Sequence, residues 1–387
     1  MHSDLPRRRA LGLLAFGALG GTSLLQGCNA VPATLRIGVA GPLTGDQAPS
    51  GYDLLNGVNL AAAELNQQGF RIQGQTVAIE VLPVDDRADI ETGKLVAQQL
   101  VDAGVVAVIG HLNSGVSMAA APIYADQHIA QLTLSTNPKF TALGFDNAFR
   151  LVANDSLQAK AMGSFSLSQF AQASRYAVAD DNTPYGKDLA DSTAAQLVAA
   201  KKSVLVRQSL DDKTTKMDEL AQAIKDAQVE VVISTLSDFQ TLALLEALKK
   251  IDYTHLNLLG SDTIKSTLML TGAGLVDGLY ATSPILDAFE FPAGAAFLEK
   301  YRARFKVEPA YAGHYTYDAM HVLAAAIKRA ESAQPQKIVE ALHVIDGYAP
   351  VTGSMKWTAQ GELRYGVIAS YNTRDNAWES LVRSDNW

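Results

Sequence analysis

The amino-acid sequence predicts an α/β protein with two doubly wound parallel-sheet lobes, joined by a hinge that the chain crosses several times. Three observations predict it. From Thr34 onward, short β-rich apolar runs alternate with segments of helical periodicity, the pattern of parallel sheets wrapped by helices. The alternation forms two sets of similar size, each too small to account for a chain of 387 residues. A long helical segment follows the second set and indicates that the chain returns to the first lobe.

The first set of elements predicts the first lobe. Residues 105–109 form a continuous apolar run rich in β-branched residues, which is typical of a strand buried on both faces. Apolar residues repeat at helical spacing between the runs, and Gly69 and Gly104 end two of these helices. The expected strands are 35–40, 77–82, 105–109 and 130–134, and the expected helices are 54–65, 95–101 and 116–127.

The second set repeats this rhythm and predicts the second lobe. Its expected strands are 176–179, 203–208, 229–234, 256–259 and 279–282, and its expected helices are 157–170, 185–200, 217–227 and 239–250. Three helices then follow at 293–305, 315–330 and 337–342, with extended segments at 366–371 and 378–382. We therefore expect lobe 1 to comprise residues 34–153 and 283–352, and lobe 2 to comprise 154–282 and 353–387.

The N-terminal segment is typical of a secretory signal. Three arginines at 7–9 precede an apolar run at 11–25, which is shorter than the roughly 20 residues that a helix needs to span a bilayer. The run ends in Leu-Gln-Gly-Cys, which resembles a bacterial lipobox, although Gln26 departs from the usual small or aliphatic residue. We expect residues 1–27 to be a signal peptide, Cys28 to carry a lipid, and the protein to reach the periplasm or cell envelope. The alternatives are an ordinary cysteine at 28 and either Sec or twin-arginine export.

Composition excludes several functions. The 32 basic and 40 acidic side chains give a net charge of -8, which argues against a nucleic-acid partner. Without residues 1–27 the chain loses three arginines and one aspartate, and its net charge becomes -10. The single cysteine excludes an intramolecular disulfide and a Cys-clustered metal site. Histidines lack metal spacing, and no phosphate-loop or nucleophile-elbow motif is present, so we expect no metal, no cofactor and no enzyme.

Polar residues follow three of the predicted strands. In open α/β sheets, ligands bind beyond the carboxyl ends of the strands, where helices begin. The three exits are 110–115, 134–138 and 259–263; they carry the hydroxyls of Ser114 and Thr136 and the carboxylate of Asp262. Each of these side chains has an alternative role as a helix N-cap, which contributes ~1 kcal/mol without any ligand. A Thr-Pro-Tyr-Gly segment at 183–186 offers Tyr185 as a cleft aromatic or as a packing residue at a helix start.

An ordered series of segments resembles one family over nearly the whole mature chain: LRIGVAGPLTG, NGVNLAAAELNQQG, DDRAD, VVAVIGHLNSGVSMAAAPIYAD, STNPKFT, DDNTPYGKDLA and LLGSDT. The family is the periplasmic substrate-binding proteins of branched-chain amino-acid transporters, with the type I fold. The resemblance implies that Ser114 and Thr136 hold the α-carboxylate of an amino acid, together with backbone groups near Leu134. It also implies that Asp262 meets the α-ammonium and that Tyr185 closes over the ligand.

Two positions depart from the family pattern. Ser50 stands where many members carry an aromatic residue, which implies a roomier or more polar side-chain pocket. Asp238 stands where amino-acid binders often have tyrosines, and it is either a second cation partner or a helix cap. The resemblance implies an extracytoplasmic component of an ABC transporter that delivers an amino acid or related zwitterion to an inner-membrane permease. A binder of an amide, urea or aromatic acid, and a sensor or envelope docking module, are the alternatives.

Overall fold

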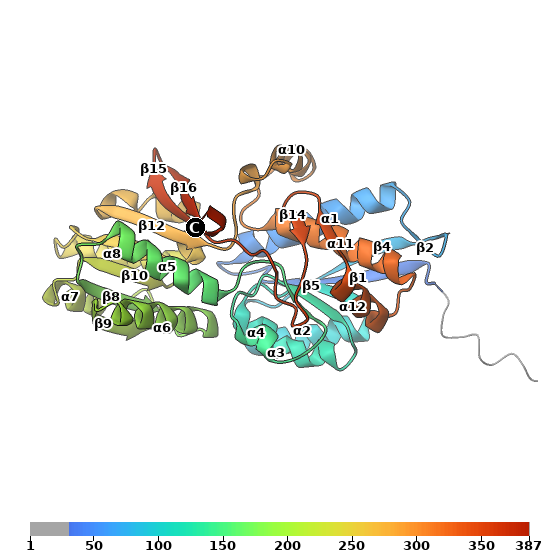
Figure 1. Cartoon of the computed structure of the whole chain (residues 1–387), viewed down its shortest axis with the longest axis horizontal. Helices are drawn as coiled ribbons and strands as arrows, with labels where there is room; N and C mark the ends of the chain where they lie inside the picture. The colour runs from blue at the N-terminus through green and yellow to red at the C-terminus, as the bar shows by residue number, and fades with distance from the viewer. Residues whose placement is uncertain (1–30, 387) are drawn as a thin grey trace, which may run out of the picture.

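The computed structural model describes residues 31–386, and it consists of two α/β lobes that lie side by side along the long axis of the molecule (Figure 1). The predicted fold class, two lobes that are each built on a mainly parallel sheet, is confirmed. The predicted signal peptide and Cys28 lie outside the described residues. Within residues 31–386, no helix is both long enough and apolar enough to cross a membrane.

The first lobe contains a five-stranded parallel sheet in the order β4-β1-β5-β6-β7. Strand β1 pairs on both sides, with Ile37 opposite Val81 in β4 and Ala107 in β5. Helices cover both faces of the sheet, so Ile37 and Val108 are fully buried, as the apolar run at 105–109 predicted. The strands are β1 (Thr34–Gly41), β4 (Ala78–Asp85), β5 (Ala107–Gly110), β6 (Ala130–Thr133) and β7 (Ala148–Arg150), and the helices are α1 (Ala48–Gln67), α2 (Ile90–Asp102), α3 (Ser114–Ala125) and α4 (Lys139–Ala142).

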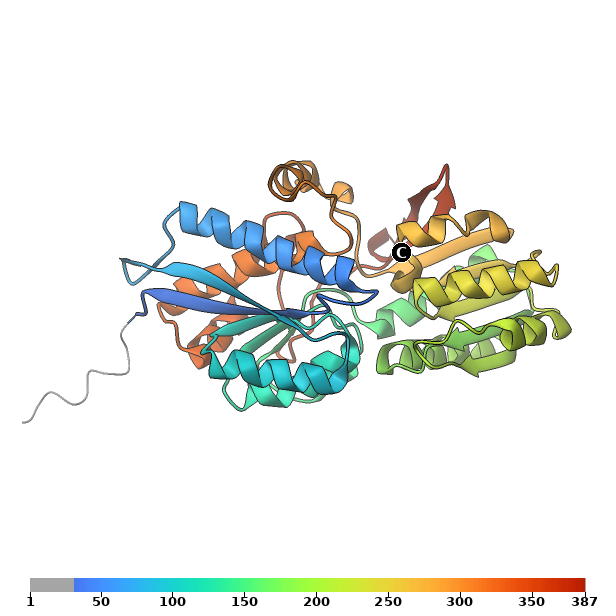
Figure 2. The same cartoon turned by 180° about the vertical axis from the view of Figure 1, so that it is seen from behind.

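The C-terminal helices complete the first lobe. Helices α10 (Gly294–Phe305), α11 (Gly313–Ala330) and α12 (Pro335–Val344) follow the second lobe in sequence, yet α11 lies against α1 (Figure 2). The contact is close at Gly57, where a Cβ atom would lie 2.0 Å from the carbonyl oxygen of Gly313. A side chain at position 57 would therefore force the two helices apart. The chain returns to the first lobe, as the helical C-terminal segment indicated.

The second lobe contains a seven-stranded sheet in the order β16-β15-β12-β11-β10-β8-β9. Strands β8 to β12 are parallel, whereas β15 and β16 add an antiparallel edge. The strands are β8 (Arg175–Asp180), β9 (Ser203–Ser209), β10 (Val231–Thr235), β11 (Asn257–Gly260), β12 (Gly278–Ser283), β15 (Ala369–Arg374) and β16 (Ala377–Arg383), and the helices are α5 (Asp155–Gln169), α6 (Pro184–Ala199), α7 (Asp218–Asp226), α8 (Asp238–Lys250) and α9 (Thr267–Leu270).

The chain passes between the lobes after β7, after β12 and before β15 (Figure 1). The hairpin of β13 (Gly347–Ala349) and β14 (Gly353–Met355) precedes the third passage. Trp357 then donates a hydrogen bond from Nε1 to the carbonyl of Arg150 in β7, at 2.7 Å. We therefore propose that the third boundary lies near residue 364 and that the other two lie near 153 and 283.

Sequence reasoning missed the shortest strands. They are β7, the hairpin of β13 and β14, and the hairpin of β2 (Arg71–Ile72) and β3 (Gln75–Thr76). Strands of only two or three residues are too short to show a periodic pattern in the sequence.

Candidate functional site

Four of the predicted site residues, two from each lobe, lie near the contact between the lobes. Ser114 begins α3 directly after β5, and Thr136 lies in the loop after β6. Tyr185 lies in the first turn of α6, and Asp262 begins a short 3₁₀ helix after β11. Each residue thus follows the carboxyl end of a parallel strand, where ligands bind in this class of fold. The lobes touch here, because the hydroxyl of Tyr311 in the first lobe donates a hydrogen bond to Asp262 in the second.

The first-lobe side of the site presents hydroxyls and the N-terminus of a helix. Ser114 and Thr136 are 4% and 5% exposed, and the Ser114 hydroxyl accepts a 3.4 Å hydrogen bond from the backbone N–H of Asn137. Asn113 precedes α3, but its Nδ2 donates to Gln47, and its Oδ1 has no partner among the described residues. The first N–H groups of α3 carry partial positive charge and favour an anion such as a carboxylate. Leu134 is buried in the core, which leaves only its backbone for a ligand.

A buried arginine holds the loop that carries Thr136. Arg150 is fully buried, and it donates hydrogen bonds to the carbonyls of Ser135 and, at 2.9 Å, of Asn137. Its guanidinium also pairs with Glu362. The two residues on either side of Thr136 are therefore fixed by one side chain. Sequence reasoning missed Arg150, although an arginine beside Phe149 and Leu151 in an apolar stretch was a usable signal.

The second-lobe side of the site is a hydrogen-bonded carboxylate. Asp262 is 5% exposed and accepts hydrogen bonds from the Tyr185 hydroxyl at 2.7 Å, the Tyr311 hydroxyl at 2.7 Å and Gln158 Nε2 at 2.9 Å. Burial, and secondly the charge of Asp262, raise the pKa of both tyrosines well above the ordinary value. Both hydroxyls therefore stay protonated and act as donors. The carboxylate is thus held by donors from both lobes.

The start of α6 explains why Tyr185 reaches Asp262. Thr183 caps the helix by accepting a hydrogen bond from the N–H of Gly186 at 3.0 Å, and Pro184 occupies the first helical position. A Cβ on Gly186 would lie 2.2 Å from Oδ1 of Asp181 and 2.9 Å from the carbonyl oxygen of Thr235. Glycine therefore lets this turn pack tightly against the sheet, with Tyr185 beside Asp262.

Tyr311 is a further residue at this contact that sequence reasoning missed. Its side chain bonds to Asp262, and its backbone N–H donates to the buried carboxylate of Asp53 at 2.8 Å. The signal was weak, because Tyr311 lies just before α11, in a region with Tyr315 and Tyr317, both of which are buried in the first-lobe core.

Further direct contacts between the lobes hold them together. Asn137 Nδ2 donates to the carbonyl of Pro184 at 2.7 Å and to Asp188 Oδ2 at 2.9 Å. Lys139 forms an ion pair with the same carboxylate at 2.7 Å. These residues connect the loop after β6 and the start of α4 to the first two turns of α6. The structure thus represents a conformation in which the two lobes are in contact at the predicted site.

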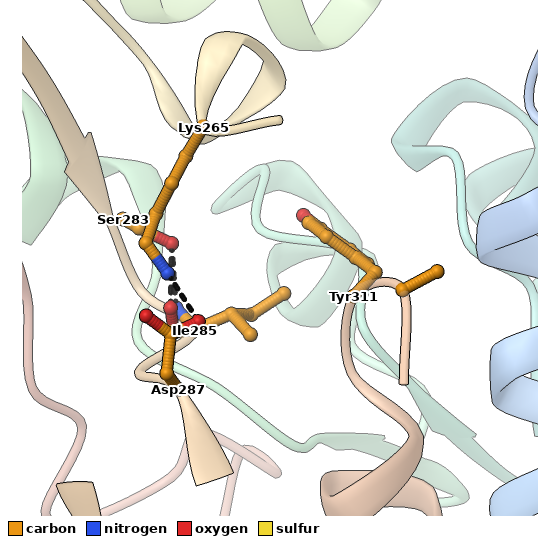
Figure 3. A pocket seen from close by; sticks show the side chains of 6 residues that line it. Lys265, Ser283, Ile285, Asp287 and Tyr311 are labelled. Carbon is orange, nitrogen blue, oxygen red and sulfur yellow. Dashed lines mark hydrogen bonds and ion pairs between the residues drawn. The ribbon is translucent and has the colours of Figure 1, made fainter. Parts of the chain in front are cut away.

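A small pocket lies beside this contact at the second passage between the lobes, and Figure 3 shows how its side chains lie. Lys265 extends toward Asp287, and their ion pair is 2.7 Å long. Tyr311 forms the opposite side of the pocket, so one tyrosine borders both this pocket and Asp262. The remaining lining residues are Ser283, Ile285 and Ala310.

Two predicted site residues do not join these contacts. Asp238 lies in the first turn of α8, where it accepts a hydrogen bond from the N–H of Phe239 at 2.8 Å, and Ser237 caps the helix. The helix cap that the sequence offered for Asp238 is therefore its neighbour Ser237, and Asp238 is the first residue inside the helix. Ser50 is partly buried in the first turn of α1, whose N-terminal end faces the second lobe (Figure 2). Both remain predictions as ligand residues. Among residues 31–386, no cluster of His, Cys, Asp and Glu is suited to a metal ion.

The fold and this interlobe site define a class, the two-lobed proteins that enclose a small ligand at a hinge. A family model described as periplasmic binding protein matches residues 34–363, and the chain belongs to this family. The Leu/Ile/Val-binding protein homolog 1 of Brucella melitensis is 29% identical over 348 residues, which cover 89% of this chain and 92% of that protein.

Solved structures share the fold. The crystal structure of a leucine-binding protein from Thermotoga maritima has a TM-score of 0.80 at 21% identity, and the match covers 91% of this chain and 100% of that chain. A solute-binding protein of an ABC transporter from R. palustris, in complex with benzoate, has a TM-score of 0.78 at 18% identity, with coverage of 90% and 95%. At these identities the structural likeness establishes the fold alone.

Proposed function

We propose that this protein is the extracytoplasmic solute-binding component of an ABC transporter, and that it binds an amino acid between its lobes. The observation that carries the proposal is the arrangement of charge across the cleft. Hydroxyls and a helix N-terminus at Ser114 and Thr136 suit a carboxylate, whereas Asp262 suits an ammonium. A small zwitterion placed between them bridges the two lobes. The name of the Brucella relative supports a branched-chain amino acid as the ligand class.

Function in this proposal requires closure and no catalysis. Ligand contacts to both lobes stabilise the closed conformation relative to the open one, so ligand shifts an existing equilibrium. The closed protein then presents a ligand-dependent surface to an inner-membrane permease. The contacts of Tyr311 with Asp262, and of Asn137 with Pro184, are the kind of interlobe bonds that such an equilibrium makes and breaks.

An aromatic acid is the second candidate ligand, since the R. palustris protein of the same fold was solved with benzoate. A benzoate anion also fits hydroxyls and a helix N-terminus, but it has no cation for Asp262. Burying Asp262 without a cationic partner leaves its charge uncompensated. The acidic second-lobe side of this site therefore favours an amino acid.

A ligand screen tests the proposal directly. Purified residues 31–387 are heated with each of the twenty amino acids, acetamide, urea and benzoate, and hits are measured by calorimetry. A ligand at 100 times its Kd stabilises the protein by ~2.7 kcal/mol, which is a clear shift in Tm. We expect branched-chain amino acids to give the largest shifts. Stabilisation by benzoate, acetamide or urea with no response to any amino acid would replace the amino-acid proposal.

The location of the protein is part of the same proposal. The family implies export to the periplasm, and we propose that residues 1–27 are removed and that Cys28 is acylated. The full-length protein expressed in a Gram-negative host is expected to fractionate with membranes. Cys28→Ala should release it, or leave an unprocessed precursor of higher mass. A Cys28→Ala protein that is processed and stays membrane-bound would contradict acylation.

A further inference from the structure

The first turn of α5 contains buried acceptors that have no donor. Asp155 is 3% exposed and Gln158 is fully buried. Among the described residues, both carboxylate oxygens of Asp155 and Oε1 of Gln158 lack a hydrogen-bond partner. Leaving such groups unsatisfied is costly, and most of all for a carboxylate. Three unpartnered acceptors within one helical turn therefore require an explanation.

The geometry places these acceptors next to Asp262. Gln158 Nε2 donates to Asp262 Oδ1 at 2.9 Å and to the carbonyl of Thr282 at 3.2 Å, and these bonds fix the amide so that Oε1 is the free end. Asp155 lies three residues earlier on the same face of α5. Its backbone N–H donates to the carbonyl of Thr136 at 2.8 Å, which holds it beside the loop that carries a predicted ligand residue.

The charges around Asp155 do not compensate it. Burial first, and then the carboxylates of Asp262 and Asp188, raise its pKa to about 8, although the nearby Thr136 hydroxyl and Arg150 act in the opposite direction. Arg150 is engaged with Glu362 and with two backbone carbonyls. The Thr136 hydroxyl makes no hydrogen bond of acceptable geometry to either carboxylate oxygen. Near neutral pH the carboxyl group is therefore largely protonated in this environment.

Asp53 is a second buried aspartate, and its hydrogen bonds show how a carboxylate with a purely structural role is satisfied by the protein. Asp53 is 1% exposed, and it accepts hydrogen bonds from the Tyr301 hydroxyl at 2.6 Å and from the backbone N–H groups of Tyr311 and Gly313 at 2.8 and 2.7 Å. Both of its oxygens are satisfied by the protein itself. Asp155 is almost as deeply buried, but neither of its oxygens accepts a hydrogen bond from the described residues. The folded structure alone therefore does not explain why an aspartate occupies this position.

We propose that Asp155 and Gln158, together with Asp262, bind the ammonium group of the ligand. A primary ammonium has three N–H donors and no acceptor, which matches three unpartnered acceptors beside a second carboxylate. On binding, the Asp155 carboxyl group loses its proton to solvent and becomes the carboxylate partner of the ammonium. The inference deepens the proposed function and rests on it. It narrows the ligand to amines, because an acid or amide of the same shape leaves the three acceptors unpaired.

The test compares amino acids with acids that lack only the amino group. L-leucine, L-isoleucine and L-valine are measured against 4-methylpentanoate, 3-methylpentanoate and 3-methylbutanoate by calorimetry at pH 7.5. The proteins are the wild type, Asp155→Asn and Asp318→Asn. Asp318 is a matched control, since it is a buried carboxylate of the first lobe that accepts hydrogen bonds from the N–H groups of Val351 and Thr352.

We expect the wild type to bind at least one of the three amino acids about 100-fold more tightly than its des-amino acid. Asp155→Asn should lose about 100-fold in amino-acid affinity, while its Tm without ligand stays the same or rises, because a buried carboxyl group without hydrogen-bond partners is replaced by an amide that cannot ionise. Asp318→Asn should lower Tm and leave affinity unchanged. An Asp155→Asn protein that binds within threefold of wild type overturns the inference and leaves the proposed function standing. A wild type that binds none of the amino acids overturns both.

Proton release gives a second measurement that needs no variant. Calorimetry of the wild type in buffers of different ionisation enthalpy reports the protons exchanged on binding. We expect release of most of one proton near pH 7 and little at pH 9, where Asp155 is mostly ionised and most of the ligand still carries its ammonium proton. Absence of release throughout pH 6 to 8 overturns the inference even if Asp155→Asn fails to fold.

Discussion

Arg150 and Glu362 form a two-point ion pair that joins the first and third passages of the chain between the lobes. Nη2 of Arg150 lies 3.0 Å from Oε1 of Glu362, and Nε lies 3.1 Å from Oε2. The arginine ends β7, directly before the chain first leaves the first lobe, and the glutamate lies just before the chain leaves it for the last time. Because Arg150 also holds the carbonyls on either side of Thr136, the hinge and the carboxylate-binding loop share one anchor.

Arg150→Met should destabilise the protein and weaken ligand binding together. Removing one partner of a buried pair costs about 3 kcal/mol, since Glu362 and two backbone carbonyls lose their donors. Urea unfolding measures the stability, and calorimetry measures the affinity. Arg36→Met is the matched control, because Arg36 and Glu80 form an ion pair whose side chains are 50% and 47% exposed. We expect a change below about 1 kcal/mol there; equal losses in both variants would contradict the role of Arg150.

The same pair predicts how stability depends on pH. Burial alone would raise the pKa of Glu362, but Arg150, Thr141 and Asn154 together hold it below the ordinary value of 4.5. A lowered carboxyl pKa stabilises the native state above pH 4.5, and this contribution disappears as the pH falls through the lowered pKa. The difference in unfolding free energy between the wild type and Glu362→Gln should therefore shrink below pH 4.5. A difference that stays constant from pH 3 to 7 would show that the ionised form is not what stabilises the hinge.

Asp188→Ala should favour the open conformation. Asp188 Oδ2 accepts from Asn137 at 2.9 Å and pairs with Lys139 at 2.7 Å, so it links the second lobe to the first. Loss of these partly exposed contacts should increase the ligand-free radius of gyration in solution scattering and lower affinity by about three- to tenfold. Asp191→Ala is the control, because Asp191 pairs with Lys187 and Arg207 inside the second lobe. A variant at 188 with unchanged scattering and affinity would show that closure does not depend on this bridge.

Asp262→Asn keeps the shape of the site and removes its charge. We expect amino-acid affinity to fall about 100-fold, because the amide provides a weaker partner for an ammonium than a carboxylate does. Asp238→Asn should change affinity by less than threefold, since Asp238 lies at a helix terminus and bonds to its neighbour's N–H. Calorimetry with L-leucine, L-isoleucine and L-valine measures the affinity of both variants. A large loss at 238 would place that residue in the site after all.

The order of secondary structure and several site residues could be predicted from the sequence because both depend on local patterns. Apolar periodicity located the main strands, and in a parallel sheet the polar residues after them must gather at one edge. That reasoning selected Ser114, Thr136, Tyr185 and Asp262, which the structure places on the two sides of the cleft. Asp238 and Ser50 came instead from the comparison with the family pattern, and the structure gives neither of them a contact with the Asp262 network among residues 31–386.

The sequence by itself determined the class of fold, the acidic balance and the strand exits that present hydroxyls and a carboxylate. Only the tertiary structure decided which side chains lack partners and which residues hold the hinge. Gln158 meets Asp262 across 104 residues of chain, and Arg150 meets Glu362 across 212. Such pairings depend on the three passages between the lobes and leave no periodic trace. Whether a buried carboxylate is satisfied, like Asp53, or unsatisfied, like Asp155, depends on donors that arrive from distant segments.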